Sequence, residues 1–431
     1  MRHLLSSLLL CLALPAGAQE FTTYKGHGGP IMALDVSPDG ALASASFDNS
    51  VGLWPGPQWL EGHDAAVTAV NFSQAPMVLS GGDDFRVLLW HPELSEPIEV
   101  TQHQGKISAI SLSPHHRRIV TASWDGSLRL HDAVDLVSGD TPPLGFVTQE
   151  LTDHRSNVTD VAFARDGTLY SASSDGTVRV WNGTGSRVLA NQGFGINRII
   201  VTDDWLAYGA VDGTTRVIEP ETGDEIADFT LDRRPILSMD YHAATGQLAI
   251  GDGEGHIMMV DTKDWQIARD FRAMRQGPVW ALAFSNDGKV IHAGGIDDVI
   301  YAWPVALLET YDPAGSDTRS FLRDAETMPN GERQFMRKCS ICHSLDAGPS
   351  RKAGPTLHGL FGRQAGIVPG YRYSPILDGS DIIWDDASID ALFDQGPDHY
   401  IPGSKMPMQV IAAPQDRADL IAFLRDATKE D

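Results

Sequence analysis

Four similar stretches of about thirty residues follow one another in the first half of the chain, and this repetition constrains the fold most strongly. The first reads GHGGPIMALDVSPDGALASASFDNSVGLW (Gly26–Trp54), and the next three span Gly62–Trp90, Gln102–His131 and Asp153–Trp181. Three weaker copies continue to about Pro304. Each copy alternates apolar and polar residues between turn signals such as PDG, RDG and NDG, which predicts strands and turns and not helices.

The copies share an Asp that lies six residues before a final Trp, as in Asp48 and Trp54. Together with the GH pairs, this spacing resembles the WD-repeat family over roughly residues 20–305. The resemblance implies seven four-stranded blades closed into an all-β propeller. It also implies a hydrogen-bonded network of His, Asp, Ser or Thr, and Trp in three copies: His27, Asp48 and Trp54; His63, Asp84 and Trp90; His154, Asp175 and Trp181.

Some copies depart from this pattern. The third has His131 in place of the Trp, and the fifth and sixth lack both His and Trp, so we expect looser blades there. No outer strand follows Trp303, so we expect Glu20–Tyr24 to pair onto the seventh blade and close the ring. Asp132–Glu150 is a long insertion, which is either an interaction loop or, as we favour, an extended blade strand.

The histidines that recur in the copies invite a metal-site interpretation. Because they fall at the same place in successive blades, they should lie apart around the ring and not converge. We therefore favour buried, hydrogen-bonded structural roles for them.

The N-terminus has the pattern of a secretory signal. Arg2 and His3 precede the apolar run Leu4–Leu14, and Ala16-Gly17-Ala18 offers a small-residue cleavage site. We expect residues 1–18 to be a signal peptide cleaved after Ala18. The mature chain would then be periplasmic, without a membrane span, since the run is too short to cross a bilayer. The net charge of −24 argues against a nucleic acid partner.

The pattern changes after the repeats. We assign residues 19–305 to the propeller and residues 306–322 to a linker, because periodicity stops where Pro, Gly and Ser accumulate. Residues 323–431 have helical periodicity and predict an all-α domain. We expect Asn330 to cap a helix that runs through Cys339 with Phe335 on its apolar side, and Asp416–Thr428 to form a final helix.

Lys338–His343 reads KCSICH and contains the C-x-x-C-H haem-attachment motif. Two thiols about one helical turn apart can bond to the two vinyl groups of one porphyrin, and the adjacent His343 can reach its iron. A disulfide would be the default in an oxidising compartment, and a redox dithiol would not need the His. A zinc site needs two more ligands, but no other Cys remains after residue 18.

Later segments strengthen the haem interpretation. They read AGPTLHGLFGRQAGIVPGYRYS (Ala353–Ser374), IIWDD (Ile382–Asp386), YIPGSKM (Tyr400–Met406) and DRADLIAFL (Asp416–Leu424). In this order they resemble class I cytochrome c of the mitochondrial and α-proteobacterial type, over about residues 325–428. The resemblance implies one haem c, covalently attached through Cys339 and Cys342, with His343 and Met406 as axial ligands.

The same resemblance implies supporting roles. The Pro355 carbonyl should accept a hydrogen bond from His343, and four residues should lie near the haem propionates: Arg363, Tyr371, Tyr373 and Trp384. Met408 is the competing sulfur ligand. The remaining matches are Ser404 near the Met loop, Gly331 and Phe423 at a close helix crossing, and Phe393, which stands where the family often has Tyr.

The acidity of the chain is unevenly distributed. From Arg319 onward there are 13 Lys and Arg against 16 Asp and Glu, a net charge of −3. Subtracting this and the single positive charge of Arg2 from the total of −24 leaves −22 for residues 19–318. A partner that docks on the propeller by charge would then be basic, unless the acidity serves only solubility.

These features favour an exported electron carrier with a propeller that docks a redox partner protein. Both axial positions of the iron would be filled, which favours electron transfer over catalysis at the haem. One alternative is an oxidoreductase whose propeller holds a separate active site or cofactor served by the haem. Another is a scaffold whose haem is structural or sensory. Fold alone does not choose between them.

Overall fold

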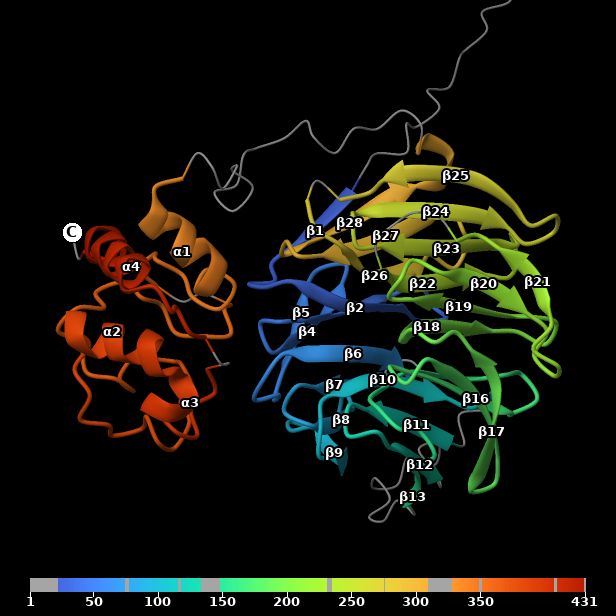
Figure 1. The fold of residues 1–431 in the computed structure, drawn as a ribbon, viewed down its shortest axis with the longest axis horizontal. Coiled ribbons are helices and arrows are strands. Elements are labelled where there is room, and N and C mark those ends of the chain that lie inside the picture. Colours follow the sequence, from blue (N-terminus) through green and yellow to red (C-terminus); the bar gives the residue numbers. More distant parts are fainter. Residues whose placement is uncertain are drawn as a thin grey trace, which may run out of the picture.

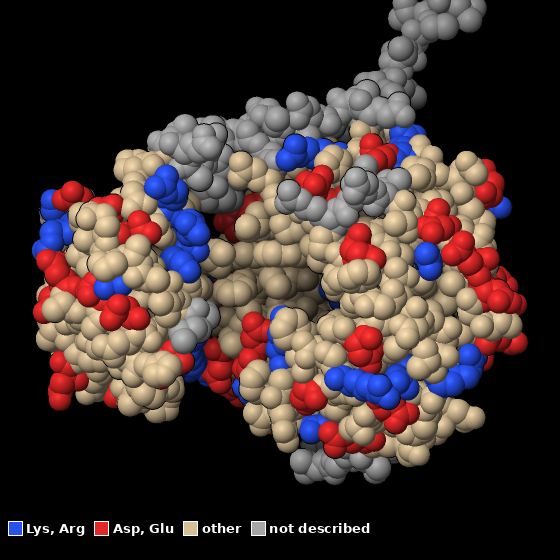
Figure 2. Space-filling model, viewed as in Figure 1, with Lys and Arg blue, Asp and Glu red and all other residues tan. Residues whose placement is uncertain are grey.

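Seven four-stranded antiparallel sheets form a ring around a central hollow, and a separate group of helices lies beside the ring (Figures 1 and 2). The structure is a computed structural model. It describes residues 22–73, 77–114, 118–132, 148–230, 235–274, 276–308, 328–348, 351–406 and 409–429. The architecture predicted from the repeats, a seven-bladed propeller followed by a helical domain, is confirmed.

Each blade is a four-stranded meander, and the strands have the following bounds. Blades one to four contain β2 (Ile31–Val36), β3 (Leu42–Ser46), β4 (Ser50–Trp54), β5 (Gln58–Glu61), β6 (Val67–Phe72), β7 (Val78–Gly82), β8 (Arg86–Trp90), β9 (Ile98–Gln102), β10 (Ile107–Leu112), β11 (Arg118–Ser123), β12 (Leu128–Asp132), β13 (Thr148–Leu151), β14 (Val158–Phe163), β15 (Leu169–Ser173), β16 (Thr177–Asn182) and β17 (Gly185–Asn191). Blades five to seven contain β18 (Ile196–Val201), β19 (Leu206–Ala210), β20 (Thr215–Ile218), β21 (Glu225–Asp228), β22 (Ile236–His242), β23 (Gln247–Asp252), β24 (His256–Asp261), β25 (Gln266–Arg272), β26 (Val279–Phe284), β27 (Val290–Gly295) and β28 (Val299–Pro304).

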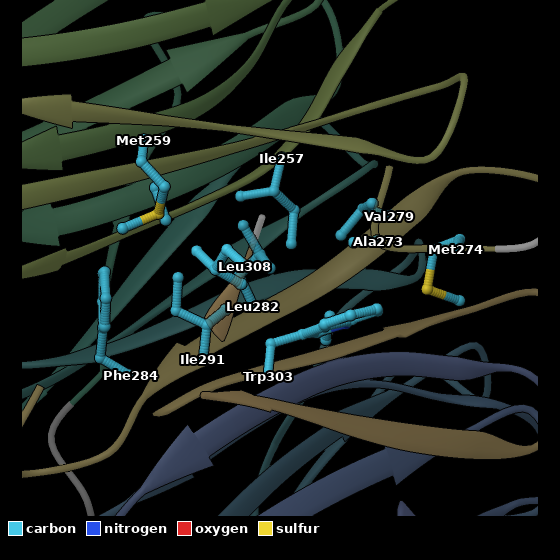
Figure 3. Close-up of a cluster of buried hydrophobic side chains, with 12 residues drawn as sticks. Ile257, Met259, Ala273, Met274, Val279, Leu282, Phe284, Ile291, Trp303 and Leu308 are labelled. Carbon is cyan, nitrogen blue, oxygen red and sulfur yellow. The ribbon is translucent and has the colours of Figure 1, made fainter. Parts of the chain in front are cut away.

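The hydrophobic core of the propeller lies between neighbouring blades. Consecutive apolar residues are buried in middle strands such as β8 and β24, and successive side chains point to opposite faces, so these sheets offer apolar residues to the blades on both sides. Figure 3 shows one such layer, in which Ile257 and Met259 of the sixth blade pack toward Leu282, Ile291 and Trp303 of the seventh. Equivalent layers join the other pairs of blades, so the ring is stabilised by repeated packing between sheets.

The ring is closed by the beginning of the described chain. β1 (Thr22–Lys25) pairs antiparallel with β28, with Thr22 opposite Ala302 and Lys25 opposite Val299. Tyr24 then lies 5.5 Å, between ring centroids, from Trp54 of the first blade. The predicted closure by the N-terminal segment is confirmed, and β1 is the outer strand of the seventh blade.

The predicted hydrogen-bonded network is present in the first blade. His27 Nδ1 lies 2.9 Å from Asp48 Oδ2, and His27 Nε2 lies 2.7 Å from Ser44 Oγ. Trp54 Nε1 donates to the same Ser44 oxygen at 2.9 Å. The second and fourth blades repeat the arrangement with Ser80 and Ser171, so in these blades each repeat His bonds within its own blade.

The fifth and sixth blades form complete sheets without this network. Between them, Trp205 lies edge-on to both Tyr241 and Trp265, at centroid distances of 4.8 and 5.4 Å. Apolar alternation therefore suffices to form these blades. The end of the Asp132–Glu150 insertion contributes to β13, which supplies the fourth strand of its blade, while residues 133–147 lie outside the described residues.

A short 3₁₀ helix, η2 (Val305–Leu307), follows the propeller, and the C-terminal domain contains α1 (Asn330–Lys338), α2 (Asp386–Gln395), α3 (Pro397–Tyr400) and α4 (Pro414–Ala427). Asp385 caps α2 by accepting a hydrogen bond from the Ser388 backbone N–H, and the Ser388 hydroxyl accepts one from the Asp385 N–H in return. The expected cap at Asn330 is wrong. Pro329 occupies that position, and the Asn330 side chain instead donates to Asp416 and Asp419 on α4.

Candidate functional site

The segment that carries both cysteines leaves α1 in a tight turn. The backbone N–H groups of Cys342 and His343 both donate to the Cys339 carbonyl, at 3.0 and 2.9 Å. This turn brings Cys339, Cys342 and His343 to one wall of a shared cavity of about 350 Å³. Burial raises the pKa of Cys339 to about 12 and that of Cys342 to about 11. These raised pKa values differ from the lowered thiol pKa that is typical of an active redox dithiol.

Apolar side chains from the helices and loops form most of the cavity wall. They come from all parts of the domain and include Leu360, Leu392, Phe393, Ile401 and Leu424. Met406 also lines the cavity, so the two expected axial residues, His343 and Met406, border the same space. Met408, the competing sulfur, lies outside the described residues.

His343 is held by its backbone surroundings. Its Nδ1 lies 2.7 Å from the Pro355 carbonyl oxygen, so the proton is on Nδ1 and the Nε2 lone pair remains for another bond. Burial lowers the pKa of His343, which keeps the ring neutral. A Cβ on Gly354 would lie 2.4 Å from the imidazole, so only glycine leaves room for the ring in this position.

The four residues expected near haem carboxylates all line the cavity: Arg363, Tyr371, Tyr373 and Trp384. Arg363 donates to the Thr356 carbonyl at 2.8 Å, and the Tyr371 hydroxyl donates to the Ala353 carbonyl at 2.7 Å. The rings of Tyr371 and Tyr373 meet edge-on at 4.8 Å. The backbone N–H of Trp384 donates to the Arg363 carbonyl, so these residues support one another.

Two serine hydroxyls in the cavity wall, those of Ser374 and Ser404, are buried and have no hydrogen-bond partner among the described residues. Buried hydroxyls normally have a partner, so both point to a polar group that occupies the cavity. The cavity therefore fits a large, mostly apolar group with a few polar atoms, as haem is. The sequence resemblance pointed to Ser404 but missed Ser374, whose only signal was its position directly after Tyr373.

The helices that carry the site cross closely. A Cβ on Gly331 of α1 would lie 2.1 Å from the Asp419 carbonyl oxygen and 2.8 Å from Phe423 Cβ, both on α4. Phe335 lies 5.5 Å, between ring centroids, from Phe423. The close crossing expected at Gly331 and Phe423 is confirmed, and it fixes the direction in which α1 leads to Cys339.

Sequence reasoning missed the contribution of the propeller to the cavity. Phe47, Asn49, Asp64–Ala66 and Asp83, from the first two blades, also line it. Contacts between residues some 300 positions apart leave no periodic or motif signal in one sequence. Among the described residues, none of the helices is long and apolar enough to cross a membrane.

Comparisons with known proteins agree with this division. Residues 18–55, 58–91, 95–132, 145–182 and 266–304 match the family "WD domain, G-beta repeat", and residues 329–428 match the family "Cytochrome c". The propeller is similar to the crystal structure of the WD40 β-propeller domain of Doa1, with a TM-score of 0.56 and 18% identity over 66% of this chain and 96% of that one. This likeness concerns the fold alone.

The C-terminal domain has closer relatives. It is 47% identical over 100 residues to cytochrome c of Sesamum indicum, which covers 23% of this chain and 88% of that protein. It is 46% identical over 99 residues to cytochrome c of Gossypium barbadense, covering 23% of this chain and 87% of the relative. These relatives are plant cytochromes c. The chain combines WD repeats with a haem electron-transfer domain and, through residues 329–428, belongs to the cytochrome c family.

Proposed function

We propose that this chain is an exported monohaem c-type cytochrome that carries electrons, with its propeller serving as a scaffold for protein partners. The observation that carries the proposal is the convergence of Cys339, Cys342, His343 and Met406 on one apolar cavity. Cys339 and Cys342 would hold haem c covalently, and His343 and Met406 would bind its iron. When bound, haem c supplies an iron centre that alternates between the ferrous and ferric states.

The protein groups around the cavity would tune this centre. The Pro355 carbonyl orients His343 and raises its basicity. Arg363, Tyr371, Tyr373 and Trp384 surround the part of the cavity where we place the haem carboxylates, since buried carboxylates need hydrogen-bond donors. Met406, as a soft ligand, would favour ferrous iron and a high reduction potential. The order of the motifs supports a class I cytochrome of the mitochondrial and α-proteobacterial type.

We place the mature protein in the periplasm, because Arg2, the apolar run and Ala16-Gly17-Ala18 form a signal pattern. N-terminal sequencing of protein purified from a periplasmic extract should begin at Gln19. A chain recovered from the cytoplasm with Met1 intact would contradict this placement.

Cofactor analysis tests the function. Protein expressed with haem-attachment machinery should contain one haem per chain that stays attached after denaturation, and a Cys339→Ala, Cys342→Ala variant should lose it. Denatured variant that still carries haem would refute the attachment. A second tightly bound cofactor in the wild type would instead favour an oxidoreductase with a separate site in the propeller.

A further inference from the structure

The mouth of the haem cavity faces the propeller. Three loops of blades one and two line it: the β3–β4 turn with Phe47 and Asn49, the β5–β6 loop at Asp64–Ala66, and the β7–β8 turn at Asp83. These loops lie at one end of the two blades, next to the group of α-helices (Figure 1). The propeller and the haem domain touch there, and the propeller covers the outer opening of the cavity.

Ion pairs connect the two sides around this opening. Lys405 Nζ lies 3.0 Å from Asp64 Oδ1, and Arg372 contacts the same carboxylate. Arg351 Nη1 lies 2.6 Å from Glu61 Oε1. The cations belong to the haem domain and the carboxylates to the propeller. In Figure 2, basic and acidic side chains meet where the two lobes touch.

The three cations are placed around the haem cavity by the chain itself. Lys405 lines the cavity and directly precedes Met406, and Arg372 lies between the lining residues Tyr371 and Tyr373. Arg351 lies two residues before Ala353, which also lines the cavity. The carboxylates therefore bind the cationic border of the cavity opening.

The propeller and the haem domain also fit closely together in this contact. A Cβ on Gly28 would lie only 1.4 Å from the Arg351 carbonyl oxygen, so the two backbones approach in a way that only glycine permits. The Arg351 guanidinium lies 4.1 Å from the centroid of the Trp59 ring. Trp59 in turn meets His27 edge-on at 4.8 Å, which ties this surface to the hydrogen-bonded network of the first blade.

Charge favours the association but leaves it reversible. Residues 19–318 carry a net charge of −22, whereas the haem domain presents Arg351, Arg372 and Lys405 on this side. Burial raises the pKa of Asp64, but Lys405 and Arg372 of the haem domain, together with Arg86 of the propeller, outweigh burial. The net result is a lowered pKa, which keeps the Asp64 carboxylate ionised. The ion pairs are partly exposed, so each contributes little and salt screens them.

We propose that the surface formed by Gly28, Trp59, Glu61 and Asp64, here called the acidic dock, is a binding site for the haem domain of the same chain. In the docked state it covers the opening of the haem cavity, and a redox partner that approaches through this opening must displace it. This inference rests on the proposed electron-transfer function. It adds that the propeller controls access to the haem.

Small-angle scattering of the full-length chain tests docking without relying on electron transfer. Glu61→Gln with Asp64→Asn should raise the radius of gyration at low salt, and high salt should raise it in the wild type. The matched control is Glu225→Gln with Asp228→Asn in the fifth blade, which removes equal charge from exposed carboxylates that pair with Arg216. Equal radii of gyration for the two variants, or docking that depends on protein concentration as in a second-copy dimer, would overturn the proposal.

Stopped-flow oxidation of the reduced protein tests the covering of the haem. The dock variant should react about two- to tenfold faster than the control variant with both hexacyanoferrate(III) and tris(phenanthroline)cobalt(III). A purely electrostatic effect would change the rates with these oppositely charged reagents in opposite directions, and that result would refute the covering. If the wild type lacks haem, the proposed function fails, while the scattering result still decides whether the domains dock.

Discussion

Replacing Ser44 by Ala should lower the free energy of unfolding of the propeller by about 2–6 kcal/mol. Ser44 Oγ accepts a hydrogen bond from Trp54 Nε1 at 2.9 Å and bonds to His27 Nε2 at 2.7 Å. Because His27 donates its Nδ1–H to Asp48, the serine hydroxyl must donate to Nε2. The substitution leaves the indole N–H and the imidazole nitrogen buried without partners, at a cost of about 1–3 kcal/mol each.

Urea unfolding of the full-length chain, followed by tryptophan fluorescence, measures this loss. Ser73→Ala is the matched control, because Ser73 is also buried but its hydroxyl has no hydrogen-bond partner among the described residues. It should change the free energy of unfolding by less than about 0.5 kcal/mol. Equal losses in Ser44→Ala and Ser73→Ala would show that the network does not stabilise the blade, and would refute the reasoning.

Two further predictions concern the seventh blade. Deleting residues 19–25 removes β1 and exposes the edge of β28, so the melting temperature of the propeller should fall by at least about 5 °C, and an unchanged melting temperature would contradict ring closure. Acid should also destabilise the propeller, because burial lowers the pKa of His292 from 6.5 to about 4. Between these values the unfolded chain binds more protons than the folded one, so stability falls as the pH falls, by up to ~3 kcal/mol from this group. His292→Leu should remove that part of the pH dependence in urea titrations, and an unchanged slope would exclude His292 as its source.

The propeller could be predicted in detail because its signals are local and repeated. Asp48 and Trp54 are six residues apart, and the hydrogen-bonded network that contains them lies within one blade. Each copy of the sequence pattern therefore predicts one four-stranded sheet. The fifth and sixth blades could be predicted from their alternating apolar residues. No motif predicted that Trp205 would pack against Tyr241 and Trp265 between these two blades.

In the helical domain, the resemblance to cytochrome c predicted the residues that line the cavity, but the sequence predicted the ends of the helices less well. Pro329 takes the N-cap position of α1, where its backbone has no N–H that needs a partner. The Asn330 side chain is therefore not a cap, and it donates a hydrogen bond to Asp419 of α4. The covering of the cavity could not be predicted, since Asp64 and Lys405 are separated by most of the chain and are held together by weak, exposed contacts.

The optical spectrum of Met406→Ala tests the central claim, a His343 and Met406 ligated haem, most directly. The variant should lose the charge-transfer band between sulfur and ferric iron and should have a lower reduction potential. Met336→Ala, which truncates a partly buried methionine in the core of the same domain, should retain both. An unchanged spectrum and potential in Met406→Ala, or loss of the band in Met408→Ala instead, would contradict the ligand assignment.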